Sequence, residues 1–401
     1  MKDVFIVDGL RTAIGKHAGA LKDTRPDDMA AVLLKEIVRR NFEKNNISPE
    51  EIEDVILGNA NGAGEENRNI ARMSLLLAGL PVSIGGATVN RLCGSGMQAF
   101  TDAVRGIRNS EGDLYLAGGV ESMTRAPFVL AKNPEPYGRR AEMFDTTIGW
   151  RFTNPKLSKM YHPYSMGETA ENVAEKYKVS RERQDEFAFN SQMKTKAAME
   201  AGKFKDEILP VEITSKKEKI IFDTDEFPRG DTTIEKLSKL KPAFREGGTV
   251  TAGNSSGIND GASILMLASE DFVKKNNLKP RARYISSAVA GVDPSCMGTG
   301  PVPATKKVLE RAGLKIDDID LIELNEAFAA QSLACIDELH LDVNKINING
   351  GAIALGHPLG SSGSRIIITL LNELEKQNKK YGLATMCIGV GQGIATIIER
   401  V

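Results

Sequence analysis

The chain has 401 residues and a formal net charge of −1, because 52 lysine and arginine residues nearly balance 53 aspartate and glutamate residues. This balance argues against nucleic acid or an anionic membrane as the main partner, and no apolar run approaches the roughly 18 residues of a membrane span. Four cysteines without a CxxC pair argue against a disulfide framework and a structural zinc site. The amino terminus lacks the apolar run of a signal peptide, so we expect a soluble, cytoplasmic protein without a metal.

Strands and helices alternate along the first third of the chain. Apolar residues three and four apart predict helices, and short apolar runs that end in glycine predict strands. The expected elements are strands at residues 3–7, 54–58 and 113–117 and helices at residues 28–38 and 69–78. This alternation is typical of a layered α/β domain with a mainly parallel sheet.

The pattern changes between residues 123 and 248. Scattered prolines and aromatic residues there indicate irregular structure rather than regular alternation. One long amphipathic segment, residues 169–199, predicts helix, and Ser180 within it resembles a cap. Alternation resumes at Thr249, so we interpret this part of the chain as an insertion into the first domain.

The second half of the chain repeats patterns of the first. Residues 315–324 repeat the helix-then-strand pattern of residues 49–57, and residues 382–387 match residues 112–117. The offset is about 260 to 270 residues in both cases, which favours an internal duplication and predicts two similar layered halves that face each other. The expected domains are a first half at 1–122 and 249–270, an inserted loop domain at 123–248, and a second half at 271–401.

Cys93 lies between an apolar stretch and a Gly-Ser-Gly turn that opens a predicted helix. A cysteine there would lie beside free amides and the positive end of a helix, a setting that stabilises thiolate over thiol. This stretch alone fits a nucleophile and a buried structural cysteine about equally well.

Three glycine-rich turns in the second half carry further reactive groups. Asn325 follows an expected strand, His357 lies between glycine and proline before a helix, and Cys387 ends the penultimate strand just before Gly389. Glycine lets the backbone approach a ligand closely, and amides at a helix start can stabilise an oxyanion. These turns favour the interpretation of Cys93 as a nucleophile.

Five motifs together resemble the thiolase family of acetyl-CoA C-acyltransferases. They are NRLCGSGMQAF, GGVESM, NEAFA, GGAIALGHPLGSSG and CIGVGQG, in this order over essentially the full chain. The resemblance implies two duplicated βαβαβαββ halves in a layered α/β/α/β/α arrangement, with an inserted loop domain for coenzyme A binding and oligomerisation. It also implies CoA-dependent cleavage of a 3-oxoacyl-CoA to acetyl-CoA and a shortened acyl-CoA, or the reverse Claisen condensation. No permanently bound cofactor is expected, and the expected partners are CoA thioesters and further copies of the chain, in a homotetramer or a dimer.

The family pattern implies a role for each reactive residue. Cys93 would be the acylated nucleophile, His357 would take its proton, and Cys387 would move the proton at the α-carbon of acetyl-CoA. Asn325 would hold a water that forms one oxyanion hole with His357, and the backbone amides of Cys93 and Gly389 would form the other. The reaction needs such groups because an acyl-enzyme divides a difficult carbon–carbon step, and the enolate must be stabilised.

Coenzyme A contacts follow from the same resemblance. Ser256 matches a family serine that contacts the pantetheine arm, and Met166 resembles a residue that lines the acyl pocket. Arg229 resembles an arginine that lies against the adenine, although it also fits a solvated surface arginine. Ala327 and Phe328, in the NEAFA motif, complete the expected contacts.

Two departures from the commoner pattern resemble the 3-oxoadipyl-CoA thiolase branch. Ser165 stands where acetoacetyl-specific members often carry histidine, and Val390 replaces a glycine of the last motif. Residues 64–69 and 145–152 resemble that branch as well. Met166-Gly167-Glu168 departs from its usual Met-Pro-Glu, so a generic 3-oxoacyl-CoA thiolase and a biosynthetic acetoacetyl-CoA thiolase stay open.

A carboxylated acyl tail would need a cation in the pocket, since an unpaired buried carboxylate is costly. Arg68 and Arg151 are the available cations in the branch-like segments, and either could equally be a surface or structural arginine.

Two other classes of protein fit parts of the pattern. A decarboxylating ketoacyl synthase of related fold would have no use for Cys387, and a non-catalytic acyl-CoA-binding relative should have lost Cys93, His357 or Cys387. Cys296 and Cys335 match no reactive family position and are expected to be packing residues.

Overall fold

A mixed sheet of ten strands joins the two halves of the chain in the computed structural model, which describes residues 2–215 and 218–401. The strand order is β12-β13-β14-β11-β1-β10-β5-β3-β4, and the short β2 pairs with β10. The strands are β1 (Val4–Arg11), β2 (Gly15–Lys16), β3 (Asp54–Gly58), β4 (Gly85–Val89), β5 (Leu114–Ser122), β10 (Asn259–Ser269), β11 (Ala282–Gly291), β12 (Leu321–Leu324), β13 (Tyr381–Ile388) and β14 (Gln392–Arg400).

The same topology occurs twice in this sheet. In the first half the order β3-β5-β10-β1 contains one parallel pair followed by two antiparallel pairs, and β12-β13-β14-β11 repeats this in the second half. The halves meet where β1 and β11 pair at Phe5 with Arg283 and at Ile6 with Ala282. This repetition agrees with the duplication expected from the sequence.

The expectation of a mainly parallel sheet is wrong. Of the pairs along the sheet order, only β12–β13, β3–β4 and β3–β5 are parallel. In the second half, the length of one connection explains the antiparallel pairing. Only three residues separate β13 from β14, and a connection this short permits antiparallel pairing alone.

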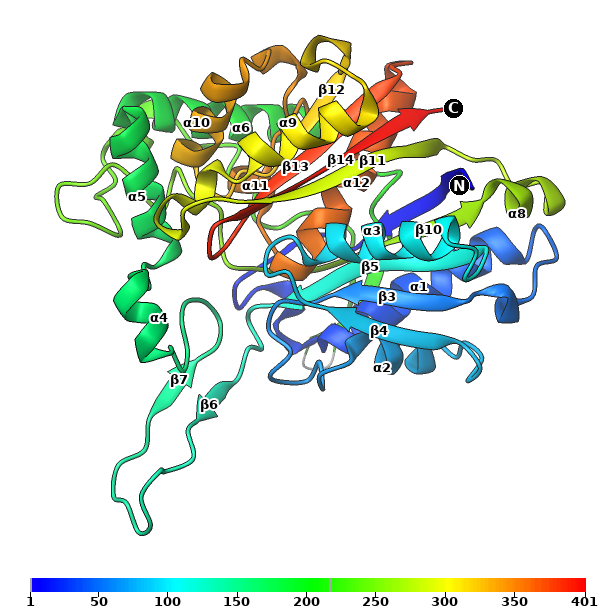
Figure 1. The fold of residues 1–401 in the computed structure, drawn as a ribbon, viewed down its shortest axis with the longest axis horizontal. Helices are drawn as coiled ribbons and strands as arrows, with labels where there is room; N and C mark the ends of the chain where they lie inside the picture. The colour runs from blue at the N-terminus through cyan, green and yellow to red at the C-terminus, as the bar shows by residue number, and fades with distance from the viewer. Residues whose placement is uncertain (1, 216–217) are drawn as a thin grey trace.

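Helices cover both outer faces of the halves and also fill the space between them (Figure 1). Helix α12 (Leu359–Lys376) packs against α3 (Ser95–Arg108) in the central layer, and residues 360–374 of α12 are buried. A helix enclosed on all sides is typical of a middle layer. The outer layers contain α1 (Pro26–Phe42), α2 (Ile70–Leu77), α9 (Pro301–Ala312) and α10 (Ala329–Leu339), and the smaller helices are α8 (Glu270–Lys275) and α11 (Ala352–Leu355). The layered α/β/α/β/α fold is therefore confirmed.

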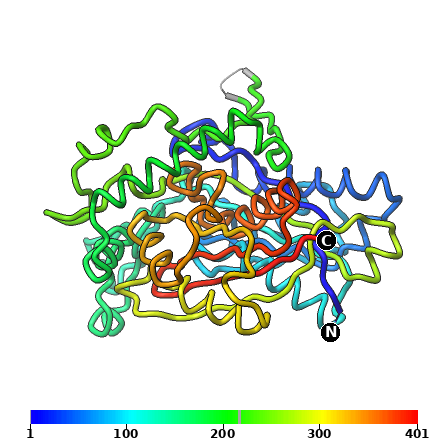
Figure 2. Tube along the Cα trace, turned by 90° about the horizontal axis from the view of Figure 1, so that it is seen from above, coloured from blue at the N-terminus to red at the C-terminus, as the bar shows by residue number. Residues whose placement is uncertain are grey.

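The segment between β5 and β10 lies outside these layers. An arm of two paired strands projects from the body in Figure 1, and the rest of the segment, green in Figure 2, runs along one side of the molecule. Its elements are β6 (Phe128–Leu130), β7 (Met143–Asp145), α4 (Pro155–Met160), α5 (Met166–Tyr177), α6 (Arg181–Glu200), β8 (Val211–Ser215), β9 (Glu218–Phe222) and α7 (Ile234–Ser238).

The long helix expected at residues 169–199 is two helices. Helix α5 ends at Lys178, which adopts the left-handed conformation with a φ of +54°, and α6 begins after Ser180. Ser180 Oγ accepts the N–H of Arg183 and so caps α6. The cap was recognised in the sequence, but the break that it implies was not.

Within residues 2–215 and 218–401, no helix has both the length and the apolar composition needed to cross a membrane. In the same part of the chain, no group of three or more histidine, cysteine, aspartate or glutamate side chains is placed to hold a metal ion.

Candidate active site

Cys93 lies in the turn between β4 and α3 and is half-buried. The turn is sharp, because Leu92 adopts a φ of +47°, in the left-handed region that residues other than glycine rarely occupy. The N–H of Gly94 donates to the carbonyl of Arg91 at 3.0 Å and closes the turn. The thiol is therefore presented at the beginning of α3, as the sequence predicted.

Burial dominates the ionisation of this thiol. It raises the pKa of Cys93 to about 11, while the backbone N–H groups of Gly389 and of Cys93 itself lie at the sulfur and oppose the rise. The amides favour the thiolate, as the turn predicts, but the loss of water outweighs them. Cys93 needs a base, and the two amides form a pair of donors at the atom that would react.

His357 is buried between α11 and α12, with its ring oriented by a serine. Ser362 Oγ donates to the carbonyl of Pro358 at 2.9 Å, so at 2.6 Å it accepts the Nδ1–H of His357. Nε2 then carries the lone pair, which accepts a hydrogen bond from Asn325 Nδ2 at 3.5 Å. Burial, followed by the charge of Arg365, lowers the pKa of His357 to about 3. His357 is therefore a neutral imidazole at neutral pH.

Asn325 and Cys387 come from neighbouring parallel strands of the second half. Asn325 follows β12 and is held by its N–H, which donates to the carbonyl of Thr385 at 3.0 Å. Its Oδ1 is buried and has no hydrogen-bond partner among the described residues. Cys387 is buried on β13, and burial raises its pKa well above the usual value. The charge of Cys93 adds to that rise, so the two sulfurs lie within electrostatic reach of each other.

The wall around Cys387 contains most of the residues expected to contact coenzyme A. Cys387 packs in one apolar cluster with Ala327 and Phe328, and Met166 lies against that cluster. The N–H of Ser256 donates to the carbonyl of Ala327 at 2.9 Å. The structure therefore brings these residues together with Cys387.

Arg229 lies in a separate pocket of about 240 Å³, here called the Arg229 pocket. Its guanidinium carbon lies 5.7 Å from the centre of the Phe227 ring. The pocket is tied to the reactive turns through Ile353 of α11, whose N–H donates to Glu326 Oε2 at 3.2 Å. The residues that line the pocket include Phe227, Arg229, Lys236, Leu240, Gly253 and Ile353.

Sequence reasoning missed two residues that orient the site. Ser362 orients His357, and nothing in the sequence distinguishes it from the serines beside it. Glu121, at the end of β5, accepts the N–H groups of Ala60 and Gly360 at 2.8 Å and that of Asn61 at 3.2 Å. It thereby connects the first half to the turn that carries His357, although burial raises the pKa of its carboxyl to about 7. The sequence offers one signal for Glu121, which is that a single acidic residue stands at the end of a buried strand.

Cys296 and Cys335 are buried, as expected. Cys335 lies behind the site, where its thiol donates to the carbonyl of Gly298 at 3.3 Å, and burial raises its pKa to about 12.

Two family models match almost the whole chain. Residues 4–271 match the thiolase N-terminal domain, and residues 278–400 match the thiolase C-terminal domain. The chain belongs to the thiolase family. Like the other members, this thiolase is an enzyme, an acyltransferase.

Relatives and solved structures agree with this assignment. The thiolase is 55% identical over 404 residues to the 3-oxoadipyl-CoA/3-oxo-5,6-dehydrosuberyl-CoA thiolase of Escherichia coli strain K12, with each chain covered fully. It is 46% identical to an acetyl-CoA acetyltransferase of Allochromatium vinosum, covering 100% of this chain and 99% of the relative. The crystal structure of the Bacillus anthracis acetyl-CoA acetyltransferase superposes with a TM-score of 0.93 at 41% identity and covers 100% of this chain and 99% of that one.

Proposed function

We propose that this thiolase cleaves 3-oxoadipyl-CoA with coenzyme A to give acetyl-CoA and succinyl-CoA, in the breakdown of aromatic compounds. The proposal is supported by identity over the full length to a relative named for this substrate. The half-buried Arg151, close to the Cys93 turn, is the structural observation that carries it. A biosynthetic acetoacetyl-CoA thiolase is the alternative, supported by the more distant acetyl-CoA acetyltransferase.

In the proposed first half-reaction, Cys93 attacks the 3-oxo carbonyl carbon while His357 Nε2 takes the thiol proton. The amides of Cys93 and Gly389 stabilise the resulting oxyanion, since both lie at the sulfur. The bond between C2 and C3 then breaks, and the electron pair leaves as the enolate of acetyl-CoA, which Cys387 protonates. His357 and a water on Asn325 Oδ1 stabilise the enolate oxygen, because that Oδ1 has no partner among the described residues.

In the second half-reaction, the thiol of coenzyme A attacks the succinyl thioester on Cys93. Between the two half-reactions His357 gives up the proton taken from Cys93, and the Cys387 thiolate is reprotonated. His357 then accepts the proton of the incoming thiol, and the tetrahedral intermediate expels the Cys93 sulfur, which takes that proton back as succinyl-CoA is released. The neutral imidazole, with its pKa near 3, is the form that this step needs. Coenzyme A enters and leaves as a substrate, and no permanently bound cofactor takes part.

Coenzyme A would extend from the Arg229 pocket to Cys93. Arg229 would stack on the adenine, Ser256 would contact the pantetheine arm, and Met166, Ala327 and Phe328 would line the acyl end. The connection is continuous, because the Ser256 N–H is bonded to the NEAFA turn that packs on Cys387. Residues 123–248 would form the inserted domain that completes this site.

Arg151 is the better candidate for binding the terminal carboxylate. Its Nη2 donates to the carbonyl of Asn61 at 3.2 Å, and the neighbouring Ala60 carbonyl accepts Asn90 Nδ2 at 2.8 Å. Asn90 begins the turn that carries Cys93. Two hydrogen bonds, through the adjacent residues Ala60 and Asn61, therefore connect Arg151 to that turn. Arg68, by contrast, is exposed.

The test compares kcat/KM for 3-oxoadipyl-CoA and acetoacetyl-CoA. We expect a preference for 3-oxoadipyl-CoA of about tenfold or more, which corresponds to about 1.4 kcal/mol of differential transition-state binding. Arg151→Gln should remove most of this preference and leave acetoacetyl-CoA cleavage intact, whereas Arg68→Gln, the matched control, should change neither. If the unmodified enzyme prefers acetoacetyl-CoA, the substrate assignment is wrong and the biosynthetic alternative stands.

The assembly proposed here is a homotetramer in the cytoplasm, with a dimer as the simpler form. The projecting arm carries exposed apolar side chains that a second copy would cover, namely Phe128, Leu130, Tyr137 and Met143.

A further inference from the structure

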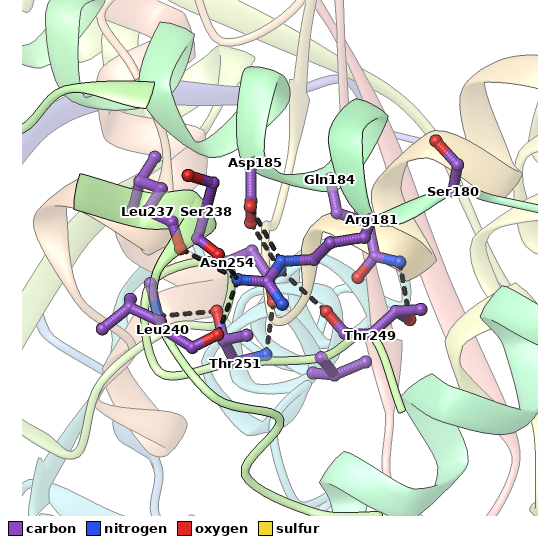
Figure 3. Close-up of polar contacts among 12 residues, drawn as sticks. Ser180, Arg181, Gln184, Asp185, Leu237, Ser238, Leu240, Thr249, Thr251 and Asn254 are labelled. Atoms are coloured by element: carbon purple, nitrogen blue, oxygen red, sulfur yellow. Dashed lines mark hydrogen bonds and ion pairs between the residues drawn. The ribbon is translucent and has the colours of Figure 1, made fainter. Parts of the chain in front are cut away.

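Arg181, the first residue of α6, holds a segment that belongs to a different part of the chain (Figure 3). Its Nη2 donates to the carbonyls of Leu237 and Leu240, at 2.8 Å each, and lies 3.4 Å from the carbonyl of Ser238. These carbonyls lie at and just beyond the end of α7, and the Leu237 carbonyl also accepts the N–H of Leu240 at 3.0 Å. One guanidinium thus fixes the path of the chain from residue 237 to residue 240.

The same guanidinium is connected to a second segment. Its Nε donates to Asp185 Oδ2 at 2.7 Å, and Asp185 Oδ1 accepts Asn254 Nδ2 at 3.0 Å. Asn254 also fixes its own loop, because Oδ1 accepts the N–H of Thr251 at 2.8 Å and Nδ2 donates to the carbonyl of Thr249 at 3.1 Å. Asp185 and Asn254 are buried, so these hydrogen bonds are shielded from water.

The two segments held in this way are two walls of the Arg229 pocket. Leu237 and Leu240 come from the first segment, and Gly253 comes from the second. The walls touch: a Cβ on Gly253 would lie 2.6 Å from Leu240 Cδ1 and 2.7 Å from Leu237 Cδ2. The second segment continues towards the reactive groups, because the Asn254 carbonyl accepts the N–H of Ala329, at the start of α10, at 2.9 Å.

We propose that Arg181 is a positioning residue for coenzyme A. Through Asp185 and Asn254 it holds both walls of the Arg229 pocket in the conformation that binds the nucleotide end of the substrate. This inference rests on the proposed placement of coenzyme A in that pocket. A pocket already held in its ligand-bound conformation loses less conformational entropy on binding, so its affinity for coenzyme A is higher. Lysine cannot replace the arginine fully, because its single ammonium lacks the planar set of donors that reaches Asp185 and the carbonyls together.

The experiment compares Arg181→Ala and Arg181→Lys with the unmodified full-length enzyme. For Arg181→Ala we expect the KM for coenzyme A to rise roughly tenfold or more, since hydrogen bonds of a charged group are lost. The kcat at saturating coenzyme A should stay within about twofold, and Arg181→Lys should recover part of the affinity. Arg183→Ala is the matched control on the same helix, because Arg183 pairs with Asp337 instead and should leave the KM unchanged.

A truncated acceptor separates positioning from a general loss of structure. Pantetheine, which lacks the nucleotide end, does not reach the Arg229 pocket, so its thiolysis rate should be the same in Arg181→Ala and in the unmodified enzyme. An unchanged KM for coenzyme A, or an equal loss with coenzyme A and pantetheine, overturns the role of Arg181. If Arg181→Ala does not fold, the same comparison of coenzyme A with pantetheine is made with Arg181→Lys and Asp185→Asn. Arg229→Ala tests the pocket itself: if its KM for coenzyme A is unchanged while that of Arg181→Ala rises, the placement of coenzyme A is wrong.

Discussion

Replacing Ser362 with alanine should shift the tautomer of His357, so that the proton moves from Nδ1 to Nε2. When Ser362 Oγ donates its only proton to the carbonyl of Pro358, it accepts Nδ1–H, and the lone pair of Nε2 faces Asn325 Nδ2. In Ser362→Ala the buried Nδ1–H would have no acceptor, which costs about 1–3 kcal/mol. The tautomer with the proton on Nε2 then becomes competitive, and it cannot act as the base. At 1.36 kcal/mol for each factor of ten, kcat/KM should fall by about 5- to 160-fold.

The assay is thiolysis of a 3-oxoacyl-CoA, monitored by loss of the enolate absorbance of the 3-oxoacyl group, with Ser361→Ala as the control. Ser361 is buried on the same helix, but its Oγ donates to Ser263 Oγ at 3.0 Å instead of contacting His357. An unchanged rate in Ser362→Ala, or an equal loss in Ser361→Ala, would refute the tautomer argument.

The pH profile gives an independent check. The pKa of His357 is lowered to about 3 by burial and the charge of Arg365. The base therefore becomes protonated, and activity lost, only as the pH falls towards that value. If kcat/KM instead falls as the pH drops below about 6.5, and the midpoint of this fall shifts when Arg365 is replaced, the lowered pKa of His357 is contradicted.

Two further predictions concern the cysteines. Incubation with acetyl-CoA should leave an acetyl group on Cys93, detected by peptide mass spectrometry, and Cys93→Ala should lose thiolysis; activity in that variant would rule out the acyl-enzyme. Cys387→Ser should slow exchange of the α-proton of acetyl-CoA by about 10²- to 10⁴-fold more than acylation of Cys93, because the two sulfurs act on different carbons. An equal loss of both partial reactions would show that Cys387 is not a specific acid–base group.

Sequence reasoning could propose the reactive residues because each lies in or beside a turn: Cys93 follows β4, Asn325 follows β12, and His357 follows the short helix α11. Asn325 and Cys387 lie at the ends of adjacent strands, and the ends of parallel strands meet at one edge of a sheet. Cys93 and His357 each precede a helix of the central layer. Strand ends and helix starts leave local signals in glycine, proline and apolar runs, so these positions could be identified without coordinates.

Other properties of the site depend on contacts that are distant in sequence. The pKa of Cys93 is set by burial, which no pattern around residue 93 reveals. Arg181 donates to backbone carbonyls 56 to 59 residues away. Every residue has a backbone carbonyl, so the sequence does not show which ones accept a hydrogen bond from this arginine. Glu121 reaches Gly360 across 239 residues. These contacts become visible only when the fold brings the segments together.

The duplication places the proposed nucleophile in one half of the chain and the proposed base in the other. The helices that follow Cys93 and His357 are α3 and α12, and they pack against each other in the shared middle layer. Their contact is made through glycine: a Cβ on Gly96 would lie 2.6 Å from the carbonyl oxygen of Gly360, and a Cβ on Gly363 would lie 2.4 Å from the backbone nitrogen of Met97. No side chain fits at either point, so the backbones of the two helix starts touch. The distance between the thiol and the imidazole is thus set by backbone contact between the two halves, which makes the glycines of both motifs part of the catalytic geometry.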